Sequence, residues 1–175
     1  YIVKTQTLPN DTYIDPNQDG TWSTGAWGQP YEDMWGLKKT HTDQAWNITR
    51  GSPEVVVAVI DTGIDKYHED LKEQLWQNTD EIPNNNVDDD SNGYVDDTWG
   101  WNFVGTITSP NANNNPQDDI YHGTHVAGTI AASVDNVKGI AGVAPNVKVM
   151  SLKIIESYDG LISAGVGAVH YASDN

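Results

Sequence analysis

The chain has 175 residues, a formal net charge of -16 at pH 7 and no cysteine. This length suits one domain with a sizeable core. The shortage of Lys and Arg argues against binding to nucleic acid or to an anionic membrane surface, because both carry negative charge. Disulfides are excluded, and no stretch approaches the ~18 apolar residues of a membrane-spanning helix. We therefore expect cations rather than polyanions as partners.

The first part of the chain is irregular and polar. Residues 1–34 are rich in Asn, Asp, Thr and Gly, and we expect them to form an arm that wraps a core made elsewhere. Further on, Thr42 or Asp43 is a suitable N-cap for a short helix that ends near Trp46. The turn residues Gly, Ser and Pro at 51–53 then predict a change of direction.

Later segments alternate between strand and helix patterns. The run Val55–Ile60 is almost entirely β-branched, which is typical of a parallel strand buried on both faces. The remaining predicted elements are strands at 99–104 and 147–155, helices at 124–134 and 161–172, and polar loops at 78–97 and 109–119. Strands that alternate with helices predict an α/β fold with a mainly parallel sheet.

Two residues in these elements suggest acid–base chemistry. Asp61 follows the first predicted strand, and functional groups of parallel sheets gather at the carboxyl ends of strands. His122 opens a helix of small residues after a polar loop, so its imidazole can reach the same edge. A carboxylate beside a histidine makes a general base for a nucleophilic hydroxyl. The alternative for each residue alone is a structural role as a turn or cap residue.

Four sequence blocks surround these residues in a characteristic order. The blocks are Val57–Asp65, His68–Leu71, His122–Thr129 and Gly139–Pro145, preceded by Trp35–Leu37 and Ala45–Trp46. Together they resemble the subtilisin-like serine peptidases, the subtilases. The similarity covers about residues 35–175.

The resemblance implies a three-layer, doubly wound subtilisin fold and a role for each residue. Asp61 would be the triad acid, His122 the general base, and His125 a structural neighbour. Residues 35–175 would be the amino-terminal portion of a catalytic domain. Residues 1–34 would precede it as an arm, with Tyr1–Lys4 as a possible propeptide tail.

The serine that completes the triad is not recognisable in the sequence. Family members carry it in a Gly-Thr-Ser-Met-type motif, after an oxyanion-hole asparagine, and neither motif occurs here. We therefore expect a chain truncated at its C-terminus and inactive alone, whose own C-terminal portion would supply the serine.

Two other functional interpretations are open. A non-catalytic, calcium-binding fragment or pseudopeptidase would keep the fold without the reaction. A different hydrolase would need another nucleophile, and no Gly-x-Ser-x-Gly motif supports it.

The loop at 84–97 has the pattern of a calcium-binding loop. The predicted oxygen ligands are Asp88, Asp90, Asn92, the carbonyl of Tyr94, and Asp96 or Asp97. Trp99 stands where an EF-hand places its bidentate glutamate, so one of the last two aspartates must close the shell. The alternative is a solvated acidic loop without a bound ion.

The resemblance also suggests a weaker metal site and a place for the substrate. Asp70 would bind calcium together with Asp135 or Asn136. A peptide substrate would lie extended beside Ile155–Gly160 and pair with its main chain, although this stretch also suits an ordinary strand-to-helix connection. Acidic charge and calcium loops favour an extracellular, secreted protein.

Overall fold

Helices and strands alternate in the second half of the chain. The helices are α1 (Trp35–Lys39), α2 (Thr42–Ala45), α3 (His122–Ala131) and α4 (Ile162–Asp174), and the strands are β1 (Val56–Asp61), β2 (Gly100–Asn102), β3 (Lys148–Lys153), β4 (Ile155–Glu156) and β5 (Asp159–Gly160). The computed structural model describes residues 8–104, 112–156, 159–160 and 162–175. None of the helices in these ranges is long and apolar enough to cross a membrane.

A parallel sheet forms the centre of the molecule. Its strand order is β1-β3-β2, and both neighbouring pairs are parallel. The register sets Asp61 of β1 and Asn102 of β2 opposite Lys153 of β3. All three residues therefore lie at the carboxyl edge of the sheet. The predicted α/β fold with a parallel sheet is confirmed.

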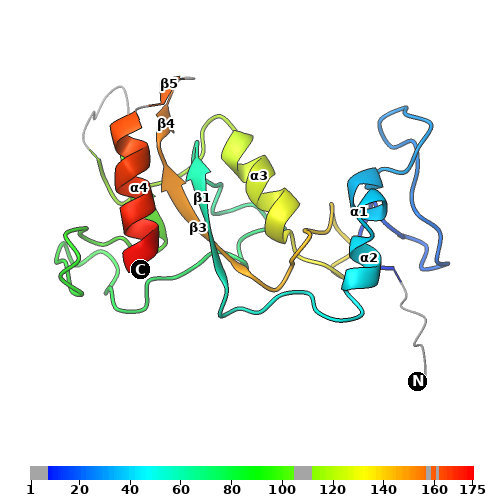
Figure 1. Ribbon diagram of the computed structural model, residues 1–175, viewed down its shortest axis with the longest axis horizontal. Coiled ribbons are helices and arrows are strands. Elements are labelled where there is room, and N and C mark those ends of the chain that lie inside the picture. Colours follow the sequence, from blue (N-terminus) through cyan, green and yellow to red (C-terminus); the bar gives the residue numbers. More distant parts are fainter. Residues whose placement is uncertain (1–7, 105–111, 157–158, 161) are drawn as a thin grey trace.

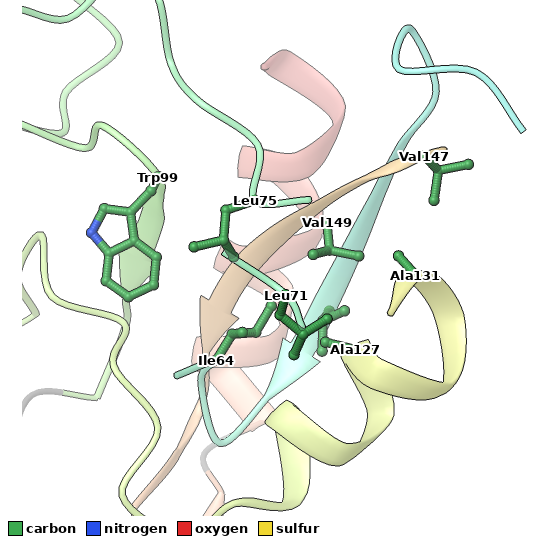
Figure 2. Packing of buried hydrophobic residues seen from close by; sticks show 9 residues of the cluster. Ile64, Leu71, Leu75, Trp99, Ala127, Ala131, Val147 and Val149 are labelled. Atoms are coloured by element: carbon green, nitrogen blue, oxygen red, sulfur yellow. The ribbon is translucent and has the colours of Figure 1, made fainter. Parts of the chain in front are cut away.

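The helix α3 covers one face of this sheet. In Figure 2, Ala127 and Ala131 project from α3 toward the side that carries Val149, and Val59 belongs to the same buried cluster. Small side chains on the helix permit a close approach, because little volume separates the two backbones. The position of α3 relative to the strands is fixed by this packing.

The helix α4 covers the opposite face, which gives three layers (Figure 1). Ala168 and Tyr171 of α4 are buried against Met150 and Leu152 of β3. Successive residues of a strand point to opposite faces. Val149 therefore packs toward α3 while its neighbour Met150 packs toward α4.

The strand β1 is less buried than its sequence predicts. We expected burial on both faces, but only Val59 is buried and Val56 is 38% exposed. The reason is that β1 lies at an edge of the described sheet, while the central strand β3 is buried from Val149 to Lys153. The apolar run thus predicted a parallel strand correctly but not its exposure.

The start of α2 also differs from the prediction. The N-cap is His41, in the left-handed conformation and without a side-chain capping bond, rather than Thr42 or Asp43. The Thr42 hydroxyl lies 2.8 Å from the Thr40 hydroxyl. The short connection from α1 therefore determines where this helix begins.

The arm packs on the rest of the chain. Between residues 8 and 34 the structure has no helix and no strand beyond an isolated bridge. Ile14 is fully buried in a cluster with Leu37 and Trp46, and Trp22 packs against it. The division at residue 34 stays a prediction, and the suggested propeptide tail at 1–4 lies outside the described residues.

We predict that Leu152→Ala destabilises the fold strongly. Leu152 is fully buried between β3 and α4, so the substitution leaves a cavity and should lower the free energy of unfolding by about 2–5 kcal/mol. Urea unfolding followed by circular dichroism measures this. The control Val166→Ala, at a position 56% exposed on α4, should change it by less than about 0.5 kcal/mol. Equal losses in both variants would contradict the assigned packing.

Candidate functional site

The two predicted acid–base residues meet at the carboxyl edge of the sheet. Asp61 is the last residue of β1, and His122 is the first residue of α3. The Nδ1 atom of His122 lies 2.8 Å from Oδ1 and 2.9 Å from Oδ2 of Asp61. The backbone N–H of Thr62 donates to Oδ1 of Asp61 at 2.7 Å. The carboxylate is therefore held from its own strand while it binds the imidazole.

This contact requires two backbones to come unusually close. A Cβ atom on Gly123 would lie 2.1 Å from the carbonyl oxygen of Gly63 and 3.2 Å from Cβ of Asp61. Gly63 itself has a φ of +103°, and a Cβ there would lie 2.4 Å from the Pro116 oxygen. Only glycine fits such positions. These glycines allow His122 to begin α3 directly beside Asp61.

The environment of the pair favours a protonated imidazole. The His122 side chain is 68% exposed, whereas the Asp61 side chain is 14% exposed. The hydrogen bond that His122 donates to Asp61, and then the charge of Asp61, raise the pKa of His122, and the charge of Asp118 adds to this. The pair therefore stabilises the fold fully below the ordinary pKa of histidine and loses this contribution as the pH rises through the raised value.

The neighbouring histidine has a different environment. His125 is exposed and lines a cavity of about 340 Å³ together with Tyr121 and Ile140. In the part of the chain that the structure describes, the side-chain bonds to Asp61 come from His122 and not from His125. The choice of the first histidine as base agrees with this geometry.

A buried lysine joins the segments around the pair. Lys153 is 1% exposed, and its Nζ lies 3.2 Å from Oδ2 of Asp119 and 2.7 Å from Oε2 of Glu156. It also donates to the carbonyl oxygen of Gln117 at 3.1 Å. The lysine thus connects the loop before His122 to β4. Nothing in the sequence singles Lys153 out, because it lies within an apolar strand pattern.

The acidic loop brings three carboxylates together. One oxygen each of Glu81, Asp90 and Asp97 lies within 4.8 Å of the other two. Asp90 and Asp97 are predicted ligands, whereas Glu81 was missed because it precedes the recognisable loop pattern by several residues. Glu81 and Asp97 are buried, and Asp90 is half-buried. This acidic cluster of Glu81, Asp90 and Asp97 is able to hold a metal ion.

Other predicted ligands shape the loop around this cluster. Asp88 accepts hydrogen bonds from the backbone N–H groups of Asn92 and Gly93 at 3.1 and 2.9 Å. Asp96 accepts two backbone N–H groups at 3.0 Å. The ring of Tyr94 packs in an aromatic cluster. Whether these residues also bind a metal stays a prediction.

Hydrogen-bond donors, rather than the basic side chains of Lys or Arg, contact the acidic cluster in the described part of the chain. The amide nitrogens of Asn78 and Asn92 each lie 2.9–3.0 Å from both Asp90 and Asp97. The Tyr171 hydroxyl donates to Asp97, and burial followed by this bond raises the pKa of Tyr171 far above its usual range. No ion pair among the described residues involves the three carboxylates. The carboxylate oxygens therefore have hydrogen-bond donors as neighbours, and they remain close enough together to hold a metal ion.

At the second predicted metal site, the carboxylates of Asp70 and Asp135 bind different side chains. Asp70 is buried and accepts a hydrogen bond from Nδ2 of Asn136 at 2.6 Å. Asp135 instead accepts from Nη1 of Arg50 at 2.7 Å. Both carboxylates influence Asp11, whose pKa is raised by burial and then by the charges of Asp135 and Asp70. Asp11 is a third carboxyl near this site that the sequence analysis did not consider.

The segment expected to bind substrate forms a small hairpin. The strands β4 and β5 pair antiparallel, with Ile155 opposite Gly160 and Glu156 opposite Asp159. Residues 157–158 of this segment lie outside the described residues. The predicted extended conformation is thus present at both ends of the segment.

Comparisons with known proteins identify relatives along the whole chain. The profile of the Subtilase family matches residues 52–174. The thermophilic serine proteinase of Bacillus sp. (strain AK1) is 32% identical over 176 residues, which cover 100% of this chain and 33% of that protein. Subtilisin-like protease 1 of Plasmodium berghei (strain Anka) is 39% identical over 158 residues, covering 85% of this chain and 25% of that protein.

Solved structures give the same relationship. A protease of Pseudoalteromonas arctica PAMC 21717 superimposes with a TM-score of 0.64 at 25% identity, covering 96% of this chain and 44% of that one. The chain therefore spans less than half the length of the relatives that it matches.

We predict that Asp61→Asn lowers the pKa of His122 toward the ordinary value for histidine. The substitution removes the charge and weakens the bond that favour the imidazolium. A pH titration of the imidazole resonances by NMR measures this. Asp119→Asn removes an equal charge at a side chain 65% exposed, and it should have a much smaller effect. An unchanged pKa in Asp61→Asn would contradict the pairing.

Proposed function

Because the chain belongs to the subtilase family, we propose that it is the acid- and base-bearing part of a serine endopeptidase. The supporting observation is the hydrogen-bonded pair of Asp61 and His122 at the carboxyl edge of the sheet. Such a pair activates a hydroxyl for attack on a peptide carbonyl. The reaction class is therefore hydrolysis of internal peptide bonds through an acyl-enzyme.

The two residues divide the proton transfer between them. With Nδ1 bound to Asp61, the imidazole keeps Nε2 free to take the proton of a serine hydroxyl. Asp61 stabilises the imidazolium that forms, and His122 then returns the proton to the leaving amine. The base must be neutral at the start, so activity should rise as the pH rises through the raised pKa of His122.

The nucleophile is a serine supplied by another portion of the protein. The family places it in a Gly-Thr-Ser-Met-type motif, which is absent from these 175 residues. That portion, with its oxyanion-hole asparagine, would join the carboxyl edge where His122 is exposed. The chain alone should be essentially inert, because loss of the serine alone lowers kcat of a subtilisin by about 10⁶-fold.

The substrate is a protein or peptide in extended conformation. It would pair its main chain with the segment that begins at Ile155, which already forms strand structure. Glu156, bonded to Lys153, anchors this segment at the same sheet edge as Asp61. A peptide there would pass close to the base.

Calcium is the cofactor that we assign to the acidic cluster. Glu81, Asp90 and Asp97 supply carboxylate oxygens, and their mutual repulsion would be relieved by a divalent cation. A second, weaker calcium site is proposed at Asp70 with Asp135 or Asn136. Bound calcium would stabilise the loops and not take part in the proton transfer. Calcium loops and the acidic charge favour an extracellular protein.

The acidic cluster also supports a second candidate function. A fragment or pseudopeptidase that keeps the fold would still bind calcium through Glu81, Asp90 and Asp97. The two candidates differ in whether the protein that carries this chain hydrolyses peptides.

We predict that His122→Ala abolishes hydrolysis by the full-length protein, whereas His125→Ala does not. Loss of the base should lower kcat by about 10⁶-fold, as in a subtilisin. His125 makes no side-chain hydrogen bond to Asp61 among the described residues, so its removal should leave most of the activity. Cleavage of a fluorogenic peptide in calcium buffer measures both. Full activity in His122→Ala would overturn the proposed mechanism.

We predict that Glu81→Gln weakens calcium binding. Calcium should raise the melting temperature of the wild-type chain, because a ligand at 100 times its Kd stabilises by about 2.7 kcal/mol. In Glu81→Gln this increase should be much smaller. Calorimetric titration and thermal unfolding measure the effect, with Glu73→Gln as control because its side chain is 77% exposed. Identical calcium responses in the two variants would contradict the site.

A further inference from the structure

Asp118, in the loop that leads into α3, is a buried carboxylate that makes no hydrogen bond to the imidazole of His122 among the described residues. Asp118 is 3% exposed and accepts five hydrogen bonds within the described residues. The donors are the Thr62 hydroxyl, the backbone N–H groups of Ile120, Tyr121 and Thr124, and the Thr124 hydroxyl. They come from the segment after β1, the turn before α3 and the first turn of α3. One side chain therefore connects every segment that positions the base.

The Thr62 hydroxyl links this carboxylate to both members of the pair. It donates to Oδ1 of Asp118 at 2.9 Å and accepts the backbone N–H of Gly123 at 2.8 Å. Thr62 directly follows Asp61, and Gly123 directly follows His122. The bond between Thr62 and Gly123 thus joins the same two backbone segments as the bond between the side chains of Asp61 and His122. A shift of either backbone must break it.

The turn before the base has a conformation that needs support. Tyr121 has a φ of +71°, in the left-handed region that non-glycine residues rarely adopt. Its backbone N–H donates to Oδ1 of Asp118 at 2.8 Å. Strained residues persist only where surrounding bonds fix them. Asp118 therefore holds the residue that determines where α3 begins and how His122 leaves the turn.

Asp118 is suited to this role because it stays ionised. Burial alone would raise the pKa of Asp118, but the hydrogen bonds from Thr124, Ile120 and Tyr121 outweigh burial and lower it. Hydrogen bonds to a charged acceptor are stronger than those between neutral groups. At neutral pH the five hydrogen bonds of this network are therefore made to a charged acceptor, which strengthens them.

We propose that Asp118 and Thr62 are positioning residues that hold His122 at hydrogen-bonding distance from Asp61. Neither residue touches the imidazole, so neither takes a proton in the reaction. The effect on catalysis rests on the proposed peptidase function, but the effect on the geometry of the pair does not. A purely structural role would change stability and leave the properties of His122 unaltered.

The test compares variants that change one hydroxyl. Thr62→Val keeps the side-chain shape, leaves the N–H of Gly123 without its acceptor and removes one donor to Asp118. Thr62→Ser restores the hydroxyl and is the rescue variant. Thr129→Val is the control, because it removes a hydroxyl on α3 that, among the described residues, bonds to the carbonyl of His125 and to neither Asp61 nor Asp118. Asp118→Asn tests the charge separately.

Two properties are measured for each variant. NMR titration of the 175-residue chain gives the pKa of His122, and peptide hydrolysis by the full-length protein gives kcat, KM and the pH profile. Thr62→Val should lower the pKa of His122 toward the ordinary value and lower kcat by about ten- to hundredfold with KM unchanged, because small misplacements of a catalytic group have effects of this size. Asp118→Asn should act in the same direction. Thr62→Ser should restore both properties.

The outcomes separate the inference from the proposed function. If Thr62→Val and Asp118→Asn are folded and keep the wild-type pKa of His122, the positioning role is overturned. If the wild-type protein hydrolyses no peptide but Thr62→Val, which removes no charge, lowers this pKa, the peptidase function fails while the positioning role stands. A lower pKa in Asp118→Asn alone would show only the loss of its charge and would overturn the positioning role. Should Thr62→Val fail to fold, Thr62→Ala removes the same hydroxyl and carries the same comparison with Thr62→Ser.

Discussion

The site depends on how closely the first turn of α3 approaches the end of β1. This approach is possible because Gly123 has no side chain where α3 meets the backbone of Gly63 and Cβ of Asp61, and because Gly63 fits in the left-handed conformation against the loop at Pro116. The sheet register fixes the end of β1, and the small residues of α3 fix the helix against the same sheet. Asp61 and His122 are the adjoining residues, so their hydrogen bond follows from backbone packing rather than from mobile side chains. Such a preformed pair loses little freedom when it begins to act as a base.

Buried negative charge is the recurring difficulty of this acidic chain, and the fold meets it in three ways. Asp118 is stabilised by hydrogen bonds from backbone amides and hydroxyls. The partly buried carboxylate of Glu156 pairs with the buried ammonium of Lys153. The carboxylates of the acidic cluster accept hydrogen bonds from amide and hydroxyl groups, and their oxygens lie close enough together to hold a metal ion. The first two arrangements lie at the carboxyl edge of the sheet, and the third lies in the loop between β1 and β2.

The sequence predicted the parts of the site that depend on local pattern. The apolar runs identified β1 and β3, and the motif after the strand pointed to Asp61, which the structure sets beside His122, while the catalytic roles of the two residues stay a prediction. The exposure of β1 was not predictable, because it depends on which strands are its neighbours. Glu81 and the role of Asp118 were also missed, since both rely on contacts between segments that are distant in the sequence or on turn geometry. Patterns of residue type carry no direct signal for such contacts.

The most direct test of the account is covalent labelling of the full-length protein. A serine-directed organophosphorus inhibitor is added in calcium buffer, and the modified residue is located by mass spectrometry. The account predicts a single labelled serine outside residues 1–175, with labelling lost when Asp61 or His122 is replaced by alanine. Labelling that persists without either residue, or a protein that is never labelled, would contradict the claim that this pair serves as the base of a serine peptidase.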